Sequence, residues 1–371
     1  MHIGLNAHLL ASGANYRRAG IHGYIQNLLA HLPAAAPDLR GTVFVGAGDP
    51  PSNPAFIIRR ARWVAERPLR RILWEQVIQP FQLSGCDLVH ELAFVAPLVM
   101  PRPFVLTVYD LTFLRYPEGL PASRRLYLRT FTRLSCRRAR RIMAISQSTA
   151  TDLRELLGVP KEKIDLAIPG VDSRFAPLPI AEIATWRERM GLPERFLLFV
   201  GTLEPRKNLP MLLRAYAALP EKDRIPLVLA GGAGWGLAAI EATLDAHDLR
   251  RWVLLPGYVP DEALIFWYNA ADAFVYPSVF EGWGMPVTEA MACGTPAFVS
   301  NVSSLPEAVG ETGAALPPDD ISAWTAALHQ MIQDRAWRRA QGEAARMRAA
   351  QFTWENTARQ TVASYKQAFQ P

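Results

Sequence analysis

The sequence predicts an α/β protein built from two doubly wound parallel-sheet domains, and three observations carry this prediction. The chain has 371 residues, enough for two domains of about 150 residues each. Short β-branched or aromatic segments alternate with longer helical stretches in two successive series, which is the pattern of βα units. The short segments are apolar with little alternation, as expected for strands that are covered on both faces of a sheet.

The first series predicts six strands in the first half of the chain. They are expected at His2–Ala7, Thr42–Gly46, Asp87–Glu91, Phe104–Tyr109, Ile142–Ser146 and Ile164–Ile168. Helical patterns lie between most of these segments, so most connections are expected to be helical crossovers between parallel strands.

The second series predicts six further strands in the second half. They are expected at Phe196–Gly201, Leu227–Gly231, Val253–Gly257, Ala273–Pro277, Ala297–Ser300 and Ala314–Leu316. Between the two series lies the segment PGVDSRFAPLPIAE, which is rich in turn formers and has no clear periodicity. We therefore expect one domain over residues 1–172 and a second over residues 173–353. Residues 354–371 predict a helix that packs back on the first domain.

The composition is that of a globular protein, because half of the residues are apolar and a fifth are charged. The three cysteines, Cys86, Cys136 and Cys293, are odd in number and lack metal-ligand spacing. This argues against a disulfide scaffold and against a structural zinc site. The first residues lack the basic and apolar regions of a signal peptide, and no apolar run reaches about 18 residues. We therefore expect a cytoplasmic protein without a bound metal.

Charge is distributed unevenly along the chain. Residues 1–170 contain 22 basic and 12 acidic residues, a net charge of +10, whereas the remainder contains 18 and 22, a net charge of −4. The segment Arg124–Arg141 alone contains eight arginines. Apolar and small residues recur in it at helical spacing, which predicts an amphipathic helix; they are Leu126, Tyr127, Thr130, Phe131, Leu134 and Ser135.

Two interpretations of this arginine-rich helix are open. Its arginines form a solvated face around apolar packing, or they bind an anionic surface, either a lipid leaflet or a polyanionic acceptor. The second interpretation places the protein peripherally on the inner face of the membrane. Nucleic acid is not an expected partner, because the chain shows no nucleic-acid-binding module and no aromatic stacking platform.

The most specific motif lies in the second half, within PSVFEGWGMPVTEAMACGTP at residues 277–296. A strand is expected to end near Tyr276, and a helix to start near Pro286, where the missing N–H costs nothing. Glu281 lies in the glycine-rich loop between them, and Glu289 in or near the first turn of the helix. Ligands bind beyond the carboxyl ends of parallel strands, and a helix N-terminus favours an anion such as a diphosphate.

The two carboxylates of this motif are suited to sugar hydroxyls, from which they can accept hydrogen bonds. The glycines of the loop allow the backbone to approach a ligand closely. For Glu289 taken alone, an acidic residue that only complements the helix dipole is the simpler interpretation. For the pair inside a glycine-rich loop after a strand, a binding site is favoured.

A second motif follows another expected strand, within FLLFVGTLEPRKNLPMLL at residues 196–213. The strand leads to Gly201, the following loop contains Arg206 and Lys207, and a helix is expected to begin around Asn208–Pro210. Two adjacent cations beside a helix N-terminus suit a diphosphate. Such a pair is usually surface charge, and it becomes informative because it follows a strand in the same domain as the two glutamates.

Together with LVLAGG, LLPGYVPDEAL and SSLPEAVGETG, these motifs resemble the family 4 glycosyltransferases, retaining enzymes of the GT-B fold with two Rossmann-like domains. The first half adds AGIHGYIQNLL, VLTVYDLTFLRYPE and IMAISQSTATDLRELLGVPKEKIDLAIPGVD, so the resemblance covers nearly the whole chain. Its most specific part is the spacing of eight residues from Glu281 to Glu289. It implies a first domain on the acceptor side and a second domain that binds a nucleotide-sugar donor in the cleft between the two.

The resemblance implies a role for each motif residue. Glu281 would hold hydroxyls of the donor sugar, Glu289 would bind the nucleotide ribose, and Arg206 and Lys207 would clamp the diphosphate. The other donor contacts implied for the second domain are Gly201, Gly257, Tyr258, Val259, Gly282, Gly284, Met285, Pro286 and Val287. On the first domain, the implied contacts are Gly20, which would approach the diphosphate, and Gly23, Asp110 and Ser146.

The chain departs from the family pattern at two places. Relatives commonly carry His-Asp where this chain has Tyr109 and Asp110, and that histidine is held to lie near the donor sugar and the leaving group. Tyr109 keeps a hydrogen-bond donor but cannot act as a proton switch near neutral pH. His22 stands where relatives have glycine, so it either takes over part of this role or is a loop histidine without chemistry. His90-Glu91, which follows an expected strand, is a further candidate for the acceptor side.

These observations predict a metal-independent, retaining hexosyltransferase without a cofactor. Breaking the anomeric bond places negative charge on the diphosphate, and Arg206, Lys207 and the helix N-terminus would stabilise it. The chain has no D-x-D pair that would indicate a bridging metal, and we identify no general base.

The resemblance of the first half, notably WEQVIQP and VYDLTFLRYPE, is greatest to bacterial mannosyltransferases of the family. We therefore expect GDP-mannose as the donor and a glycan or lipid-linked hydroxyl as the acceptor. A UDP-sugar is the alternative donor. A catalytically silent sugar-nucleotide-binding or membrane-associated protein is a second alternative, raised by Tyr109, and a phosphorylase or epimerase of the same fold is a third.

Overall fold

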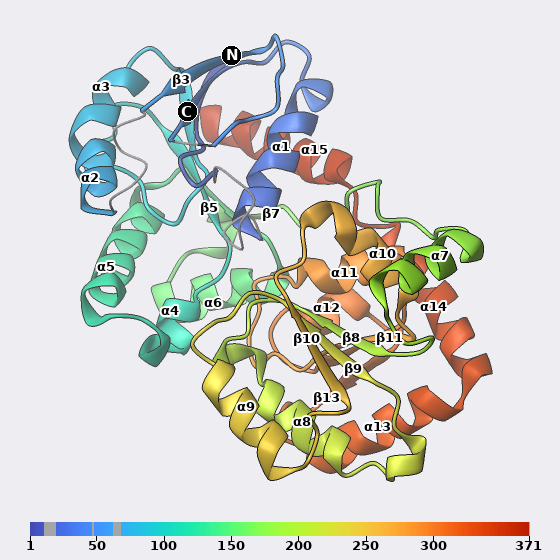
Figure 1. Ribbon diagram of the computed structural model, residues 1–371. Helices are drawn as coiled ribbons and strands as arrows, with labels where there is room; N and C mark the ends of the chain where they lie inside the picture. Colours follow the sequence, from blue (N-terminus) through green and yellow to red (C-terminus); the bar gives the residue numbers. More distant parts are fainter. Residues whose placement is uncertain (11–19, 47, 62–67, 371) are drawn as a thin grey trace. The chain divides into compact units, whose positions relative to one another are not determined.

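The computed structural model describes residues 1–10, 20–46, 48–61 and 68–370. They form two units, one of Met1–Gly170 with Thr353–Pro371 and the other of Val171–Phe352. Each unit is a parallel β-sheet with helices on its faces (Figure 1). The predicted fold class is therefore confirmed. The chain passes from the first unit to the second two residues before the expected boundary and returns at Thr353.

The sheet of unit 1 has seven strands in the order β3-β2-β1-β4-β5-β6-β7, and every pairing is parallel. The strands are β1 (His2–Asn6), β2 (Arg40–Val45), β3 (Phe56–Arg60), β4 (Leu88–Glu91), β5 (Phe104–Val108), β6 (Arg141–Ala144) and β7 (Ile164–Leu166). Six of them lie where the sequence predicts strands. The seventh, β3, was not expected, because it lies at the sheet edge and four of its five residues are exposed, so it lacks the buried apolar pattern of the other strands.

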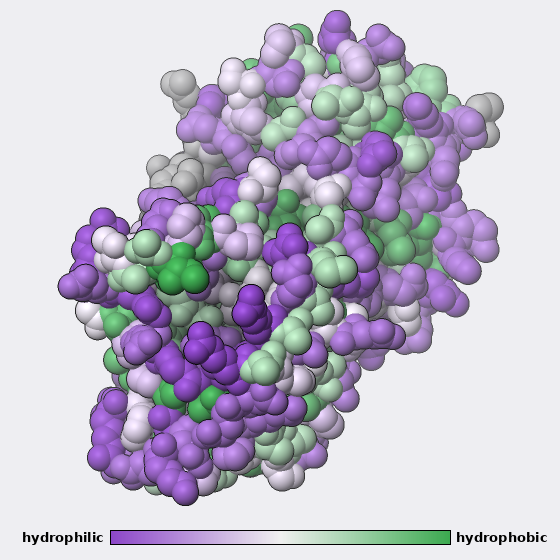
Figure 2. Space-filling view, turned by 90° about the vertical axis from the view of Figure 1, so that its right-hand side faces the viewer, coloured by the Kyte–Doolittle hydropathy of each residue, from purple (hydrophilic) through white to green (hydrophobic). Residues whose placement is uncertain are grey.

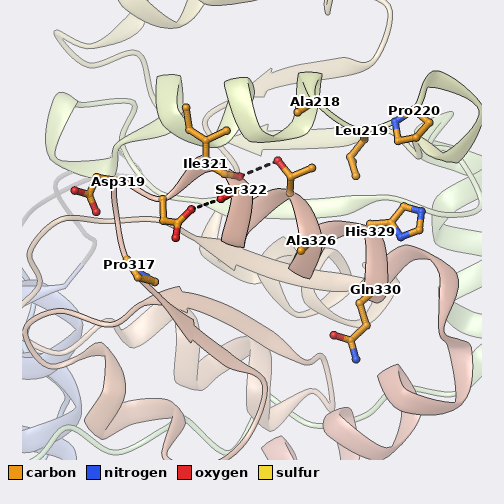
Figure 3. A pocket seen from close by; sticks show the side chains of 12 residues that line it. Ala218, Leu219, Pro220, Pro317, Asp319, Ile321, Ser322, Ala326, His329 and Gln330 are labelled. Carbon is orange, nitrogen blue, oxygen red and sulfur yellow. Dashed lines mark hydrogen bonds between the residues drawn. The ribbon is translucent and has the colours of Figure 1, made fainter.

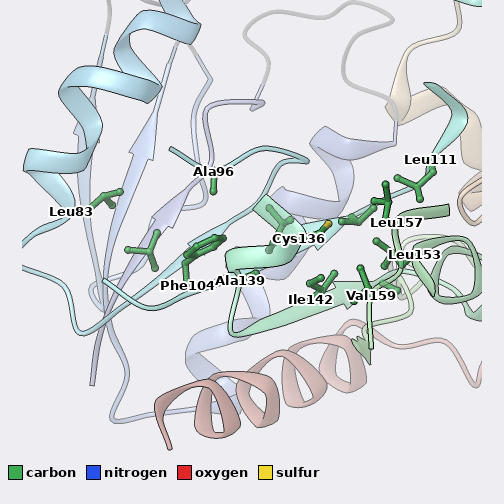
Figure 4. Close-up of a cluster of buried hydrophobic side chains, with 14 of the residues drawn as sticks. Leu83, Ala96, Phe104, Leu111, Cys136, Ala139, Ile142, Leu153, Leu157 and Val159 are labelled. Carbon is green, nitrogen blue, oxygen red and sulfur yellow. The ribbon is translucent and has the colours of Figure 1, made fainter. Parts of the chain in front are cut away.

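Helices of unit 1 cover both faces of this sheet. They are α1 (Ile21–Ala35), α2 (Pro68–Leu73), the π-helix η3 (Trp74–Ile78), α3 (Gln79–Leu83), α4 (Thr112–Arg115), η4 (Pro117–Gly119), α5 (Ala122–Arg138), α6 (Gln147–Leu157), η5 (Lys161–Lys163) and α15 (Trp354–Phe369). A hydrophobic cluster joins α3, β5, α5, β6 and α6 (Figure 4), with Leu83, Phe104, Cys136, Ile142 and Leu153 among its members.

The C-terminal helix α15 is part of unit 1 although 182 residues of unit 2 separate it from the rest. Its buried residues recur at helical spacing, at Trp354, Ala358, Val362 and Tyr365. Thr357 Oγ1 donates a hydrogen bond to the carbonyl of Ile168 at 2.5 Å. The helix therefore closes unit 1 through both apolar packing and specific hydrogen bonds.

The arginine-rich helix α5 differs from the prediction in two respects. It ends at Arg138, and Arg141 begins strand β6. Its buried residues Thr132, Ser135 and Cys136 lie in the C-terminal half, and the partly buried Leu128 also packs against the core. Leu126 and Thr130 of the predicted apolar face are exposed. The helix extends past the core at its N-terminal end, so spacing alone did not identify the buried face.

The sheet of unit 2 has six strands in the order β10-β9-β8-β11-β12-β13, again all parallel. The strands are β8 (Leu197–Val200), β9 (Leu227–Ala230), β10 (Val253–Gly257), β11 (Ala273–Tyr276), β12 (Ala297–Ser300) and β13 (Ala314–Leu316). All six lie where the sequence predicts strands. The helices are α7 (Ile180–Met190), η6 (Pro205–Lys207), α8 (Leu209–Ala217), η7 (Glu221–Asp223), α9 (Leu237–Ala246), η8 (Asp261–Ala263), α10 (Leu264–Ala270), α11 (Met285–Ala292), α12 (Leu305–Val309), α13 (Ile321–Gln333) and α14 (Arg335–Ala349).

The two sheets share one topology. In each unit the first strand lies between the second and the fourth, so strand order reverses between β1 and β4 and between β8 and β11. In open α/β sheets, ligands bind beyond the carboxyl ends of the strands at such a switch point. The ends of β1, β4, β8 and β11 are therefore the places to look for a site.

On the face drawn in Figure 2, hydrophilic residues predominate and hydrophobic residues form small separate groups. None of the helices in the described part of the chain combines the length and the apolar character needed to cross a bilayer.

Candidate functional site

The carboxyl ends of β8 and β11 bring Arg206, Lys207 and Glu281 together. Arg206 and Lys207 lie in η6 after β8, and Glu281 lies in the loop after β11. Lys207 Nζ is 2.6 Å from Glu281 Oε1, and Arg206 Nη1 is 2.8 Å from Glu281 Oε2. Two cations therefore hold one carboxylate at the switch point of unit 2.

These charges are buried and compensate one another. Burial disfavours the charge on Glu281, but Arg206 and Lys207 outweigh it and lower the pKa of this carboxyl to about 2. Burial lowers the pKa of Lys207, and the nearby Glu281 opposes this effect. Glu204 lies 2.6 Å from Arg206 as well, so the cluster of Glu204, Arg206, Lys207 and Glu281 holds two positive and two negative charges.

Further hydrogen bonds join η6 to the loop after β11. Arg206 Nη1 donates to the carbonyl of Phe280 at 2.5 Å, and the N–H of Val279 donates to the carbonyl of Arg206 at 2.9 Å. Lys207 Nζ also donates to the hydroxyl of Tyr276 at 2.5 Å. Both cations expected to clamp a diphosphate are thus held in fixed positions, and each is shared with Glu281.

The loop after β11 ends at Gly284, which caps helix α11. Gly284 has φ 95°, a backbone conformation that favours glycine, and a Cβ added there would also press on Leu305 Cδ2 at 2.9 Å. Met285, Pro286 and Val287 form the first turn of α11, and no acidic residue lies in it. Pro286 has no N–H, and the N–H of Val287 donates to the carbonyl of Gly284 at 2.9 Å. The N–H of Met285 is therefore the group of these three that can bind an anion.

Glu289 is the fifth residue of α11 and lies directly after the first turn of the helix. The effect of a helix dipole falls off within the first turn, so complementing the dipole does not explain Glu289. Its Oε2 accepts a hydrogen bond from the hydroxyl of Tyr268 at 2.8 Å. Burial raises the pKa of Glu289 to about 7, Asp261 adds to the effect, and the Tyr268 hydrogen bond opposes it.

The other residues predicted for unit 2 lie at the same edge of the sheet. Gly201 follows β8, and Gly257 ends β10 with φ 78°. Tyr258, which follows it, is exposed, and Val259 is at the limit of burial. Gly282 is buried in the loop between Glu281 and Gly284.

In unit 1, the ends of β1 and β4 hold a polar group that we call the Asn6 cluster: Asn6, His8, Glu75, Gln79 and Glu91. Asn6 and Glu91 are opposite each other in the sheet, and Asn6 Nδ2 donates to Glu91 Oε2 at 2.5 Å. His8 Nδ1 lies 2.9 Å from Asn6 Oδ1, and its Nε2 lies 2.7 Å from Glu75 Oε1. Only Glu91 of this cluster was among the predicted candidates. Asn6 and His8, directly at the end of an expected strand, were the signal that could have revealed it.

Glu91 is buried and forms no ion pair with a lysine or arginine of residues 1–10, 20–46, 48–61 and 68–370. Burial raises its pKa to about 8, Glu75 adds to the shift, and the hydrogen bond from Asn6 opposes it. The Asn6 cluster contains no lysine or arginine. Near neutral pH, its Glu91 is therefore predominantly protonated and uncharged.

Three residues predicted to meet the donor from unit 1 serve the local structure. The hydroxyl of Tyr109 donates to the carbonyl of Leu92 at 3.0 Å, and its buried ring packs edge-on against Tyr24. Ser146 is fully buried and caps α6, because its Oγ accepts a hydrogen bond from the N–H of Thr149 at 3.0 Å. Asp110 Oδ1 accepts a hydrogen bond from the N–H of Thr112 at 2.8 Å. Tyr109 thus packs in unit 1 and Ser146 caps a helix, and their contact with a ligand stays a prediction.

His90 is also a core residue, contrary to the expectation of an acceptor-side position. Its ring nitrogens lie 2.7 Å from the hydroxyl of Tyr365 in α15 and 2.7 Å from Thr107 Oγ1. Burial lowers the pKa of His90 to about 3, so the ring is neutral and joins α15 to the sheet.

Gly20, His22 and Gly23, which were predicted to contact the donor, lie at the start of helix α1. Gly20 is the N-cap of α1 with φ 64°, and a Cβ added there would meet no atom within 4 Å. Its conformation, and not lack of space, therefore favours glycine. His22 and Gly23 lie in the first turn of α1, and His22 is buried.

A cavity of about 1100 Å³ lies elsewhere in unit 2, between the end of α8 and helix α13 (Figure 3). Leu219, Ile321 and His329 are among its lining residues. None of the residues predicted for the donor lines it. Within the residues that the structure describes, no group of three or more histidine, cysteine, aspartate or glutamate side chains could hold a metal ion.

The fold and the matching family models define the class of this protein. Sucrose-phosphate synthase from Thermosynechococcus elongatus superimposes with a TM-score of 0.78 over 99% of both chains, at 26% sequence identity. The model of glycosyl transferases group 1 matches residues 182–348, and the model of Glycosyltransferase Family 4 matches residues 19–175. The chain is a glycosyltransferase of the GT-B fold.

Within this class, the chain belongs to glycosyltransferase family 4. O-antigen chain mannosyltransferase B of Escherichia coli is 36% identical over 265 residues, which cover 71% of this chain and 70% of the relative. Serotype-specific mannosyltransferase WbdA of Escherichia coli is 32% identical over 280 residues, 73% of this chain, and the match spans 34% of the length of WbdA.

Proposed function

We propose that this glycosyltransferase is a retaining, metal-independent mannosyltransferase that transfers mannose from GDP-mannose to a hydroxyl of a glycan or lipid-linked acceptor. The observation that carries the proposal is the buried cluster of Arg206, Lys207 and Glu281 beside the N-terminus of α11. It combines two cations for a diphosphate with a carboxylate for sugar hydroxyls. The mannosyltransferases among the relatives support the choice of sugar.

In this proposal, the donor meets unit 2 at three places. The diphosphate lies against Arg206, Lys207 and the N–H of Met285 at the start of α11. Glu281 accepts hydrogen bonds from the sugar, and Glu289 accepts them from the ribose. Gly257, Tyr258 and Val259 border the base, and Gly20 of unit 1 approaches the diphosphate.

The reaction breaks the bond between the anomeric carbon and the diphosphate oxygen, and the acceptor oxygen bonds to that carbon on the same face. The acceptor proton passes to the leaving phosphate oxygen. Negative charge grows on the diphosphate as the bond breaks, and Arg206 and Lys207 are already positioned to stabilise it. Removing one such group from a prepared site typically costs about 2.7–4 kcal/mol of transition-state stabilisation. The two cations supply the positive charge that a metal ion would otherwise provide.

Unit 1 is assigned to the acceptor. The arginines of α5 give it a strongly basic helix, which suits an anionic acceptor or a membrane surface. With a lipid-linked acceptor, the enzyme would work peripherally on the cytoplasmic face of the membrane.

The proposal is tested by thermal shifts with GDP, UDP, ADP and TDP, each with and without Mg²⁺, and by the anomeric configuration of the product in NMR. A ligand at 100 times its Kd stabilises by about 2.7 kcal/mol. We expect a shift with GDP that Mg²⁺ does not change, and retention at the anomeric carbon. A shift with UDP alone would support a UDP-sugar donor, and a requirement for Mg²⁺ would overturn the metal-free site. No shift with any nucleotide would favour a catalytically silent protein.

A further inference from the structure

The loop after β9 in unit 2 presents a tryptophan to solvent at the carboxyl edge of the sheet. Among the tryptophans that the structure describes, Trp235 is the only exposed one, with an exposed fraction of 65%. Tryptophan is highly buried on average. A single exposed apolar side chain needs no explanation by itself, but the loop around Trp235 holds this one in a fixed place.

We call residues 231–236 the Trp235 loop, and its backbone is pressed against the loop after β8. A Cβ added at Gly234 would lie 2.5 Å from the carbonyl oxygen of Leu203. The N–H of Gly236 donates to the same carbonyl at 3.1 Å. A glycine on each side of Trp235 therefore allows the close contact of two backbones, and this contact fixes the segment from which the indole projects.

Trp235 is tied to the proposed diphosphate clamp but lies away from the nucleotide. The loop after β8, to which its backbone is bonded, continues into η6 with Arg206 and Lys207. In Figure 1, α8 and α9 cover one face of the sheet of unit 2, and α10 and α11 cover the other. The Trp235 loop leads into α9, whereas Glu289, which we assign to the ribose, lies in α11. The ribose and Trp235 thus belong to opposite sides of the clamp.

The Trp235 loop offers a flat apolar face and no charge. Its sequence is GGAGWG, so the loop supplies no cation to a phosphate group and only one large side chain to an apolar protein partner. The indole combines apolar area with one N–H donor. A pyranose ring has the matching chemistry, because its C–H groups form an apolar face and its hydroxyls surround that face.

We infer that Trp235 stacks on a sugar ring of the acceptor glycan, so that unit 2 takes part in acceptor binding. The inference rests on the proposed function, which supplies a glycan acceptor, and goes beyond it because that function assigns the acceptor to unit 1 alone. The acceptor has to meet the sugar that Glu281 holds at the clamp. A ring held in place before binding loses little conformational freedom when the glycan arrives.

Intrinsic fluorescence of the full chain in the presence of GDP tests this contact. The probes are three neutral trisaccharides: mannotriose, maltotriose and chitotriose. An exposed indole that becomes covered by a sugar emits at shorter wavelength, so the wild type should show this change with at least one trisaccharide, and Trp235→Phe should not. Trp252→Phe is the matched control, because Trp252 directly precedes β10 at the amino edge of the same sheet; this variant should keep the change.

Initial rates with the responding trisaccharide as acceptor give a second test. Trp235→Ala should raise the KM for the acceptor about tenfold, the order expected for one lost aromatic contact. Trp235→Phe keeps a flat ring and should raise it less. The kcat at saturating acceptor and the KM for GDP-mannose should stay at the wild-type values, because the substitution removes no contact to the donor.

Two outcomes would overturn the inference. In the first, no trisaccharide produces a fluorescence change that depends on Trp235. In the second, Trp235→Ala weakens GDP-mannose and leaves the KM for the acceptor unchanged, which would place the indole in the donor site. The thermal shift with GDP reports the donor separately, and all three variants should retain it. Loss of that shift in the wild type would refute the donor assignment, whereas the fluorescence change would still report on Trp235.

Discussion

Two buried glutamates occupy equivalent places in the two units and have opposite electrostatic surroundings. Glu281 follows β11 and Glu91 ends β4, each beside the strand where the order of its sheet reverses. Two cations lower the pKa of Glu281 to about 2 against the effect of burial. Burial and the nearby Glu75 raise the pKa of Glu91 to about 8, and among the described residues no lysine or arginine opposes them. The same topology thus holds a charged carboxylate in one unit and a neutral carboxyl in the other.

This difference matches the ligands that we assign to the two units. A diphosphate brings negative charge, and a site for it must hold positive charge in place before it arrives. A glycan hydroxyl is neutral, and the polar groups of the Asn6 cluster can exchange hydrogen bonds without a net charge. The fold places a binding position at the carboxyl ends of the strands, and the side chains that follow each strand determine whether a charged or a neutral ligand group binds there.

Removing the Glu281 carboxylate in unit 2 should have the largest effect on both stability and transfer rate. In Glu281→Gln, Arg206 and Lys207 stay buried without their shared partner, and breaking a buried ion pair costs roughly 3–5 kcal/mol. Transfer should fall at least about a hundredfold, since hydrogen bonds to charged groups are worth about 1.5–3 kcal/mol each. Denaturant unfolding and initial rates with GDP-mannose measure the two effects. GDP should stabilise the variant more than the wild type, because its diphosphate then neutralises the cations.

Glu204→Gln is the matched control, because it removes a carboxylate from Arg206 and leaves both contacts to Glu281. This variant should lower the free energy of unfolding by about 1 kcal/mol and change the rate of sugar transfer little. The pKa of Glu281 lies below its usual 4.5, so its contribution to stability is present above that value and is lost as pH falls toward 2. A Glu281→Gln variant with wild-type rate and wild-type acid stability would end its assignment to the donor.

Glu91→Gln should have the next largest effect on stability. Unlike Glu281→Gln, it should stabilise the protein at high pH. The folded pKa of about 8 exceeds the usual 4.5, so the stabilising form is the protonated one. Stability is then greatest below about 4.5 and decreases as pH rises through 8, by about 1.4 kcal/mol per pH unit. The glutamine cannot ionise, so the variant should be more stable than the wild type at about pH 9 by a few kcal/mol. Thermal unfolding across this pH range measures the difference.

The exposed Glu118 provides the control for this experiment. Glu118→Gln should leave the pH dependence of the wild type unchanged. If Glu91→Gln keeps the same decrease in stability toward high pH, another group causes it, and the contrast between the two units fails.

Glu289→Gln should produce a smaller, pH-dependent effect on binding. The ionised carboxylate offers two acceptor oxygens to ribose hydroxyls, whereas glutamine and the protonated carboxyl each carry a donor group at one of these positions. The pKa of Glu289 is about 7 without ligand. Affinity for GDP-mannose should therefore decrease about tenfold per pH unit below 7 in the wild type and become pH-independent in the variant. Tyr268→Phe removes a hydrogen bond that lowers this pKa, so its binding curve should shift to higher pH. Wild-type affinity that is constant from about pH 6 to pH 8 would refute the ribose contact.

Sequence reasoning located the regular parts of the fold and the charged site. Twelve of the thirteen strands lie where apolar segments predict them, because strands buried on both faces leave a strong pattern. Glu281, Arg206 and Lys207 were predicted from two separate motifs, and the topology joins them at one switch point. The shared ion pairs could not be predicted, since residues 206 and 281 belong to distant segments whose contact depends on the packing of two loops.

Sequence reasoning did not reveal which polar side chains form hydrogen bonds inside the core. Tyr109, Ser146 and His90 follow or end strands, as ligand-binding residues do, but their polar atoms bind Leu92, Thr149 and Tyr365 instead. The partner of His90 lies 275 residues away in α15, a contact that no local pattern reveals. Glu75 and Gln79 of the Asn6 cluster were missed because they lie in and after a π-helix, whose wider turn alters the helical spacing.

The smallest predicted effect concerns Tyr109, where the family commonly has histidine. Its hydroxyl donates to the buried carbonyl of Leu92, so Tyr109→Phe should cost about 1 kcal/mol and lower Tm by roughly 2–4 °C. The kcat and KM for GDP-mannose should stay at the wild-type values, because the hydroxyl is buried and bonded to the protein itself. Tyr24→Phe is the control, since Tyr24 packs against the same ring and its hydroxyl donates to the carbonyl of Ala167 at 3.3 Å. Equal small losses of Tm in both variants would make Tyr109 a packing residue, whereas a loss of kcat in Tyr109→Phe alone would return its hydroxyl to the transfer step.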